Sequence, residues 1–489
     1  MSYFGRLNYE YNSKYIATVN FRSDASSKFR KENRWGYFPS FSSAWRVSKE
    51  DFMSSLDFIT DLKLRAGWGK TGNDRVGDYD AFNLYTVDAS SGYVLGNNQT
   101  FYPGAYQSNI AVPDLRWEST SQTNLGIDLN LFKKINLTID YYFKRTKDLL
   151  LDAETSPSTG FDRIQQNVGE VTNKGLEITI ESKIIKSKDF EWDTNFNISF
   201  NKTNTVKLNN GQTEILTDPE WDTQFMQNEY QYVTRVNNPV GMIYGLEFDG
   251  IYQLDDFVLT NGGSYQLKSG IPSYRTQMQP GMVKFRDQLT VDTNSDGIAD
   301  AGDGIINDLD RKIIGNPQPK HTGGFLNNFR YKSFDLQVLF QWAFDFDILN
   351  GNESQFGSIY NQTRNGFSSL SDIWTPTNTD TSIGGMRYNG INTTTPIGYK
   401  LDSRFVDDGS YLKLKTIVLG YNLPKSVLKK LKLTNFRISV AAQNLYRWTS
   451  YKGYDPDVSV GRYGALTPGL DYSAYPQSAT VTGGIDVTF

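Results

Sequence analysis

The stretch Gly483-Gly484-Ile485-Asp486-Val487-Thr488-Phe489 ends the chain with an alternating pattern. Ile485, Val487 and Phe489 alternate with polar residues, so they share one face of an extended strand. The chain stops on the last aromatic residue of this pattern. The ending therefore predicts a strand that runs to the final residue, with one apolar face and one polar face.

The same alternation recurs along the whole sequence and predicts about 13 strands. Many of them extend over about 10 residues, which exceeds the usual globular strand of about 5–6 and matches a tilted crossing of a bilayer. The expected strands span 3–12, 14–22, 37–48, 58–68, 119–132, 134–146, 170–183, 190–202, 321–332, 334–345, 408–422, 433–446 and 480–489.

The connections between these strands alternate between short and long. Short ones are expected at Asn12-Ser13, Lys133-Lys134, Ser187-Lys188 and Lys332-Ser333. Long ones run roughly over 22–36, 69–118, 146–169, 203–320, 346–405 and 447–479. Short turns on one side and long loops on the other are typical of outer-membrane barrels. We therefore expect an all-β, antiparallel transmembrane β-barrel with short periplasmic turns and long extracellular loops.

The bulk composition agrees with this fold class. Aromatic residues make up 14% of the chain and charged residues 21%. A mean hydropathy of −0.51 suits barrel strands, because these are apolar only on alternate residues. The sequence contains no run of about 18 apolar residues, so we expect no transmembrane helix.

Charge and residue usage exclude several functions. The net charge is −4 and no basic stripe stands out, so nucleic acid is not an expected partner. The chain has no cysteine and a single histidine, His321, which excludes disulfides and multi-histidine zinc sites. No recognisable catalytic constellation occurs, so we do not expect an enzyme.

The beginning of the sequence suggests that the chain is part of something longer. Residues 1–9 enter a strand pattern directly, without the features of a signal peptide. About 13 strands is an odd number, whereas bacterial single-chain barrels use an even number. We therefore expect residues 1–489 to be the C-terminal part of a larger barrel.

Several sequence blocks carry a family resemblance. They are Arg34-Trp-Gly-Tyr-Phe-Pro-Ser40, Leu64-Arg-Ala-Gly-Trp-Gly-Lys-Thr-Gly-Asn73, Leu115-Arg-Trp-Glu118, Asn167-Val-Gly-Glu-Val-Thr-Asn-Lys-Gly-Leu-Glu177, Gly409-Ser-Tyr-Leu-Lys-Leu-Lys415, Gln443-Asn-Leu445 and Tyr451-Lys-Gly-Tyr-Asp-Pro-Asp457. In these blocks and their order, the chain resembles the C-terminal half of the SusC/RagA-type TonB-dependent transporters of Bacteroidetes outer membranes.

The resemblance implies a 22-stranded barrel with an internal plug, of which this chain would supply about 13 strands. The plug, the TonB box and the signal peptide would lie outside this sequence. The implied function is energised import of a large nutrient across the cell outer membrane, most often a glycan oligomer and sometimes a peptide. The implied partners are a SusD-like surface lipoprotein, TonB through the missing N-terminal region, and outer-membrane lipid. The alternative is a surface glycan-binding or adhesion barrel without energised transport.

One acidic stretch within the long extracellular region 203–320 has the spacing of an EF-hand-type calcium loop, residues 292–303. Gly297 stands at position 6, and Asp303 replaces the usual bidentate glutamate at position 12. Ca²⁺ is the expected ion, with Mg²⁺ as an alternative, because the oxygen ligands are numerous and flexible. A solvated acidic turn explains the same composition. The expected ligands are the side chains of Asp292, Asn294, Asp296, Asp300 and Asp303, with the backbone carbonyl of Ile298.

Overall fold

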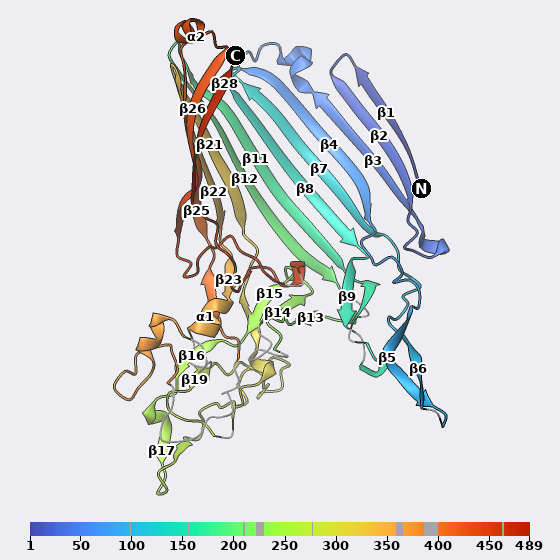
Figure 1. The fold of residues 1–489 in the computed structure, drawn as a ribbon, viewed down its shortest axis with the longest axis vertical. Coiled ribbons are helices and arrows are strands. Elements are labelled where there is room, and N and C mark those ends of the chain that lie inside the picture. Colours follow the sequence, from blue (N-terminus) through green and yellow to red (C-terminus); the bar gives the residue numbers. More distant parts are fainter. Residues whose placement is uncertain are drawn as a thin grey trace. The chain divides into compact units, whose positions relative to one another are not determined.

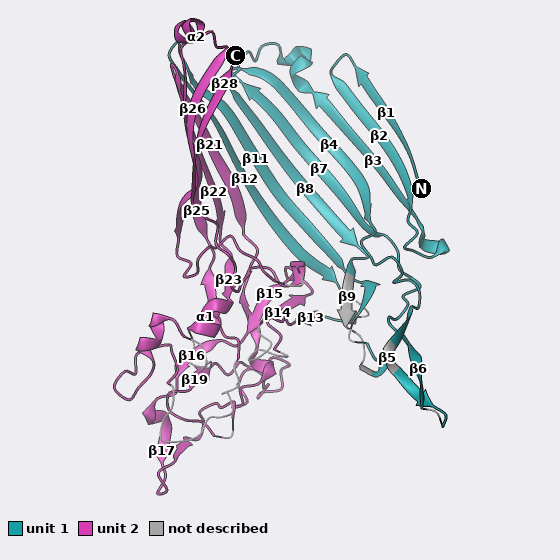
Figure 2. Ribbon diagram, in the orientation of Figure 1, with its two compact units in different colours: residues 1–213 teal, residues 214–489 magenta. Residues whose placement is uncertain are grey.

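The computed structural model describes residues 1–97, 99–154, 157–161, 163–208, 211–221, 229–275, 277–357, 365–385, 400–461 and 464–489. Antiparallel strands make up most of it, and helices are few and short (Figure 1). The chain divides into two compact units, Met1–Thr213 and Glu214–Phe489 (Figure 2). We call them unit 1 and unit 2. No helix in the described ranges is both long enough and apolar enough to cross a membrane.

Unit 1 contains eight long strands, each paired antiparallel with the next. Two hairpins lie in its long connections: β5 (Tyr85–Leu95) with β6 (Thr100–Gln107), and β9 (Leu150–Glu154) with β10 (Arg163–Asn167). In sheet order the long strands are β1 (Ser2–Tyr11), β2 (Tyr15–Ala25), β3 (Trp35–Arg46), β4 (Ile59–Asn73), β7 (Glu118–Leu131), β8 (Ile135–Lys147), β11 (Glu170–Lys186) and β12 (Phe190–Lys207).

Unit 2 contains five long strands, also antiparallel. With the eight of unit 1 they make the 13 strands that the alternation predicts. The predicted boundaries hold to within a few residues, although β4 continues past 68 to Asn73, β12 continues past 202 to Lys207, and the last strand ends at Thr488. The five strands are β21 (His321–Tyr331), β22 (Phe334–Phe344), β25 (Tyr411–Asn422), β26 (Asn435–Thr449) and β28 (Thr480–Thr488).

The short connections have the backbone that tight hairpins require. Asn12 and Ser13 both have a φ of 52°, and both lie between β1 and β2. Two successive positive φ values give a turn whose twist matches that of the flanking strands. Phe132 and Lys133 repeat this geometry, so the turn predicted at Lys133-Lys134 lies one residue earlier. A short helix, α2 (Lys425–Leu431), joins β25 to β26.

Each long strand of unit 1 has two different faces. In register, Leu64 on β4 is opposite Ile127 on β7, and Ile127 is opposite Ile139 on β8. Leu64 and Ile127 are exposed, at 37% and 39%. The next residues in register, beginning with Arg65, belong to the other face, because side chains alternate along a strand. Exposed apolar side chains across neighbouring strands are typical of a surface that faces lipid.

The long connections of unit 2 fold into small sheets. The predicted loop region 203–320 therefore contains several short strands, and its residues 209–210, 222–228 and 276 lie outside the described residues. The sheets are formed by β13 (Glu214–Thr217), β14 (Tyr232–Arg235), β15 (Met242–Gly245) and β20 (Lys312–Gly315), by β16 (Phe248–Ile251) and β19 (Val283–Phe285), by β17 (Phe257–Leu259) and β18 (Tyr265–Leu267), and by β23 (Asp347–Asn350), β24 (Val406–Asp408) and β27 (Leu470–Asp471).

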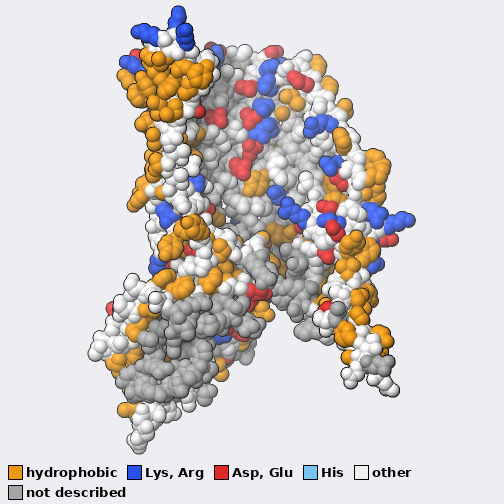
Figure 3. All heavy atoms as spheres, in the orientation of Figure 1, with side chains coloured by type: hydrophobic (Ala, Val, Ile, Leu, Met, Phe, Trp, Pro, Cys, Tyr) orange, Lys and Arg blue, Asp and Glu red, His pale blue; other side chains and the backbone are white. Residues whose placement is uncertain are grey.

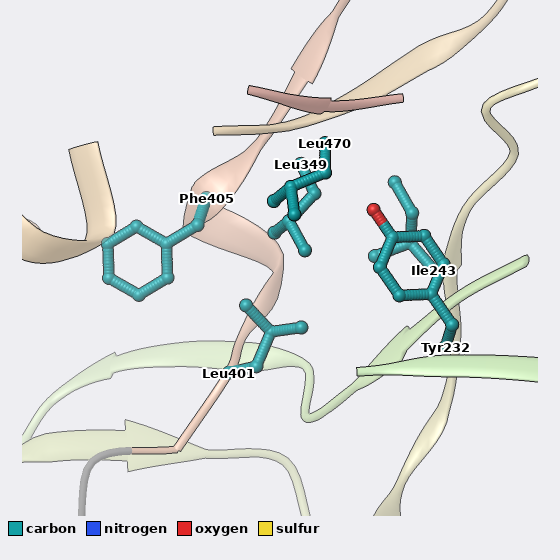
Figure 4. Packing of buried hydrophobic residues seen from close by; sticks show 6 residues of the cluster. All are labelled: Tyr232, Ile243, Leu349, Leu401, Phe405 and Leu470. Atoms are coloured by element: carbon teal, nitrogen blue, oxygen red, sulfur yellow. The ribbon is translucent and has the colours of Figure 1, made fainter. Parts of the chain in front are cut away.

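A hydrophobic cluster joins two of these sheets, the one with β14 and β15 and the one with β23 and β27. Burying such side chains contributes about 1.5–3 kcal/mol each, so six of them can fix a loop region that lacks long strands. The helix α1 (Gly351–Phe356) follows β23 directly, and its position is therefore tied to this cluster. The buried members are Tyr232, Ile243, Leu349, Leu401, Phe405 and Leu470 (Figure 4).

Candidate functional site

A charged network occupies one face of unit 1, which we call the polar face. Arg65 donates from Nε and Nη2 to the two carboxylate oxygens of Asp128, at 2.9 and 2.8 Å. Its Nη1 also lies 2.9 Å from Oδ1 of Asp140, and Lys63 lies 2.7 Å from Asp128. Acidic and basic side chains gather over the strands of unit 1 in Figure 3. Two cations and two carboxylates thus neutralise one another on this face.

A glycine makes room for this network. Gly126 lies on β7, opposite Arg65 on one side and Asp140 on the other. A Cβ atom at Gly126 would lie 2.5 Å from Oδ1 of Asp140 and 2.6 Å from Cζ of Arg65. The arginine therefore crosses β7 only because that position has no side chain. A glycine inside an alternating strand is the sequence signal that could have predicted this approach.

Unit 2 contains a second arrangement of the same kind. Arg437 on β26 donates to both carboxylate oxygens of Asp335 on β22, at 2.6 and 2.7 Å. Gly420 on β25 separates them, and a Cβ atom there would lie 2.6 Å from Cζ of Arg437 and 2.7 Å from Oδ1 of Asp335. Asn422 also donates to Asp335, at 2.9 Å. Both units thus place an arginine–aspartate pair across a strand at a glycine.

Two of the sequence blocks meet in a buried ion cluster. Lys413 comes from the block 409–415 and is only 3% exposed. It lies 2.8 Å from Asp455 and 3.2 Å from Asp457, both in the block 451–457. Burial alone would raise the pKa of Asp455, but the hydrogen bond from Lys413 and the neighbouring Arg447 hold it below its usual value. This contact joins the two sequence blocks in the folded chain.

The predicted calcium loop is exposed and closed at its base by a bridge between Val291 and Ala301. The carboxylate of Asp292 accepts hydrogen bonds from the backbone N–H groups of Asp296 and Gly297, at 3.3 and 2.8 Å. Gly297 has a φ of +87°, as the tight turn requires. In the first half of the loop, the carboxylate of Asp292 therefore points inward, toward the backbone N–H groups of the turn.

The remaining predicted ligands make local hydrogen bonds. Asn294 accepts from the N–H of Asp296 at 3.0 Å, and Asp296 accepts from the N–H of Ile298 at 2.8 Å. Asp300 accepts from both the N–H and the hydroxyl of Thr293, and these hydrogen bonds lower the pKa of Asp300. Asp303 accepts from the N–H of Ile305 at 2.8 Å.

These contacts bear on whether the loop fits a metal ion. In the described ranges, no three acidic or histidine side chains lie close enough together to hold one. The carboxylates instead satisfy backbone donors, as in a solvated acidic turn. Calcium binding therefore stays a prediction that metal titration can test.

Sequence reasoning missed a cavity in unit 2. Its lining includes Phe248, Glu353, Ile383 and Arg404, which come from four separate segments. No spacing pattern links residues so far apart in sequence, so the sequence alone carried no signal for this site.

Comparison with known proteins gives consistent matches along the chain. Residues 1–235 match the family described as "TonB dependent receptor-like, beta-barrel". All of the chain aligns with "TonB-dependent receptor P3" of Formosa agariphila, at 36% identity over 495 residues. It also aligns with "TonB-dependent receptor SusC" of Bacteroides thetaiotaomicron, at 29% identity over 500 residues. These alignments cover 45% and 44% of the two relatives, so the chain spans about half their length.

The fold has a close likeness among solved structures. The structure titled "Structure of the RagAB peptide transporter" superposes with a TM-score of 0.79 at 22% sequence identity. The superposition covers all of this chain and 47% of the other one. At this identity the likeness shows the fold alone.

Proposed function

Because the chain belongs to the TonB-dependent receptors, a family of outer-membrane β-barrels, we propose that it forms part of the wall of a nutrient importer. The polar face of unit 1 carries the proposal. Lys63, Arg65, Asp128 and Asp140 place four charges on strands whose other face exposes apolar side chains. A barrel wall in lipid needs this division, with charges toward a watery interior and apolar groups outward.

Further strands would complete this wall. Among the described strands, β1 pairs only with β2, and β28 pairs only with β26. A free strand edge in lipid leaves backbone N–H and C=O groups unsatisfied, at a cost of several kcal/mol each. We expect the rest of a 22-stranded barrel, with its plug, to come from sequence that the relatives have and this chain does not include.

The proposed cargo is a large nutrient, most often a glycan oligomer and alternatively a peptide. The first choice rests on the resemblance to SusC-type receptors, of which SusC itself is a relative. The second is the other cargo that the resemblance to SusC/RagA-type transporters implies. We further propose a SusD-like surface lipoprotein as a lid and TonB as the energy-coupling partner. The role is import, and no catalysis is proposed.

Uptake by living cells tests this function. We would compare cells with and without the complete transporter, offering fluorescent glycan oligomers or peptides with and without a protonophore. Import predicts that the cells with the transporter accumulate label, and that the protonophore abolishes accumulation but leaves surface binding. Surface binding without energy-dependent uptake would instead support the adhesion alternative.

A further inference from the structure

Unit 2 contains a cavity of about 300 Å³ in its loop region. Phe248, Val283, Ile383 and Phe405 supply its apolar lining. Ligand cavities in proteins range from about 300 to 1,000 Å³, so this one suits a single residue of a larger ligand.

Contacts behind the lining hold the cavity in shape. Phe405 is 4% exposed and belongs to the hydrophobic cluster of Figure 4, which fixes one wall. The opposite segment is pinned by backbone hydrogen bonds, since Gly385 donates to Gly281 at 2.8 Å and Trp374 donates to Ile383 at 2.9 Å. The lining is therefore preformed, which lowers the entropy cost of binding.

The two cations at the cavity already have anionic partners. Arg404 donates from Nε and Nη2 to the two carboxylate oxygens of Asp402, at 2.8 and 2.7 Å. Its guanidinium also lies over the ring of Phe248, 4.7 Å from the centroid. Lys452 lies 3.3 Å from Asp407. Each cation thus pairs with an aspartate and forms no ion pair with Glu353 in the described ranges.

Glu353 is the exception. It lies on α1 and lines the cavity, but its carboxylate makes no hydrogen bond or ion pair within the described ranges. Burial raises the pKa of Glu353, Lys452 opposes that rise, and Asp407 adds to it. Partial burial of a carboxylate that has no partner costs free energy of desolvation. A cationic ligand would offset this cost by pairing with the carboxylate.

We propose that this cavity binds a primary ammonium group, with Glu353 as its counter-ion and the apolar lining against the body that carries it. Two sources share this chemistry: the amine of an amino sugar in a glycan, and the amine of a peptide. The ammonium would donate charge-assisted hydrogen bonds to a carboxylate partly shielded from water. This inference depends on the proposed import function only in naming the source of the ligand, which would be the imported nutrient.

Binding to the complete transporter in detergent micelles tests this inference. Isothermal titration would use a glucosamine dimer and a lysine-containing tripeptide, each beside its N-acetylated form. We expect acetylation of the amine to weaken binding at least about tenfold, because a hydrogen bond to a charged group is lost. Tight binding of the sugar alone or of the peptide alone would identify the source of the ammonium group. Binding of both would mean that the site recognises the amine and not the molecule that carries it.

Variants locate the binding in the cavity. Glu353→Gln keeps the shape and removes the charge, so we expect the same loss of at least about tenfold. Ile383→Phe fills the cavity and should block both probes, even if Glu353→Gln folds poorly. Asp255→Asn is the control, because Asp255 is exposed and does not line the cavity.

Three outcomes would overturn the inference: no probe binds, acetylation makes no difference, or Glu353→Gln binds as the wild type does. Binding is measured without cells, so the two proposals can fail separately. A negative uptake result would not contradict ammonium binding by the cavity, and a negative binding result would not contradict import.

Discussion

Arg65 and Asp140 form an ion pair across an intervening strand, with Nη1 and Oδ1 2.9 Å apart. Arg65 lies on β4 and Asp140 on β8, and the strand between them, β7, has a glycine at the crossing point. The pair of Arg437 and Asp335 repeats this arrangement in unit 2, at Gly420. Each pair reaches over a strand and so ties three strands of its own unit together.

Gly126→Ala tests this construction. The added methyl group would overlap both Arg65 and Asp140, so the pair must separate or the strand must shift. We expect a loss of about 1–3 kcal/mol in the free energy of unfolding, measured by urea denaturation in detergent. Gly483→Ala on β28 is the matched control, because a Cβ there meets no atom within 4 Å. Equal stability of the two variants would contradict the account.

Lys413→Met tests the buried ion cluster. The change leaves Asp455, whose side chain is 7% exposed, without its closest cation. Removing one partner of a buried pair costs about 3–5 kcal/mol, and we expect a destabilisation of that order in the same assay. Lys415→Met on the same strand is the control, since Lys415 donates to the neutral Gln477 and to no carboxylate within the described ranges. An unchanged midpoint for Lys413→Met would show that the pair does not hold these two sequence blocks together.

Glu50 predicts a pH dependence of stability. Its carboxylate accepts hydrogen bonds from Trp45, Tyr15 and Lys14, which lower its pKa from 4.5 to about 2. A carboxylate with a depressed pKa stabilises the folded state fully above 4.5 and loses this contribution as the pH falls toward 2. The stability gap between the wild type and Glu50→Gln should therefore shrink over this range. A gap that stays constant or widens on acidification would refute the assignment.

Calcium binding by residues 292–303 is tested by metal titration. After treatment with a chelator, the chain should take up Ca²⁺ weakly, with a dissociation constant of about 10⁻⁴–10⁻³ M, because Asp303 is shorter than the usual glutamate. Asp296→Ala should abolish uptake, and Asp255→Asn should not. If the wild type takes up no Ca²⁺, the stretch is a solvated acidic turn.

The sequence predicted the long strands well because their signals are local. Alternation sets which residues share a face, and Asn12-Ser13 and its counterparts set the hairpins. The ion cluster of Lys413 with Asp455 escaped prediction, because the two residues are 42 positions apart and no period relates them. The cavity at Glu353 escaped for the same reason. The crossing at Gly126 could have been found, since an isolated glycine in a strand marks a close approach.

The central claim is that these strands form a barrel wall with lipid on one side and water on the other. The chain has no native cysteine. Single cysteines can therefore be placed along β7 in the complete transporter in outer membranes, after any cysteine outside residues 1–489 is replaced by serine. Ile127→Cys should react only with a lipid-soluble maleimide, and Asp128→Cys should react with a membrane-impermeant, water-soluble one. The account predicts that this preference alternates from residue to residue along the strand. Equal reactivity of neighbouring positions with the water-soluble reagent would contradict it.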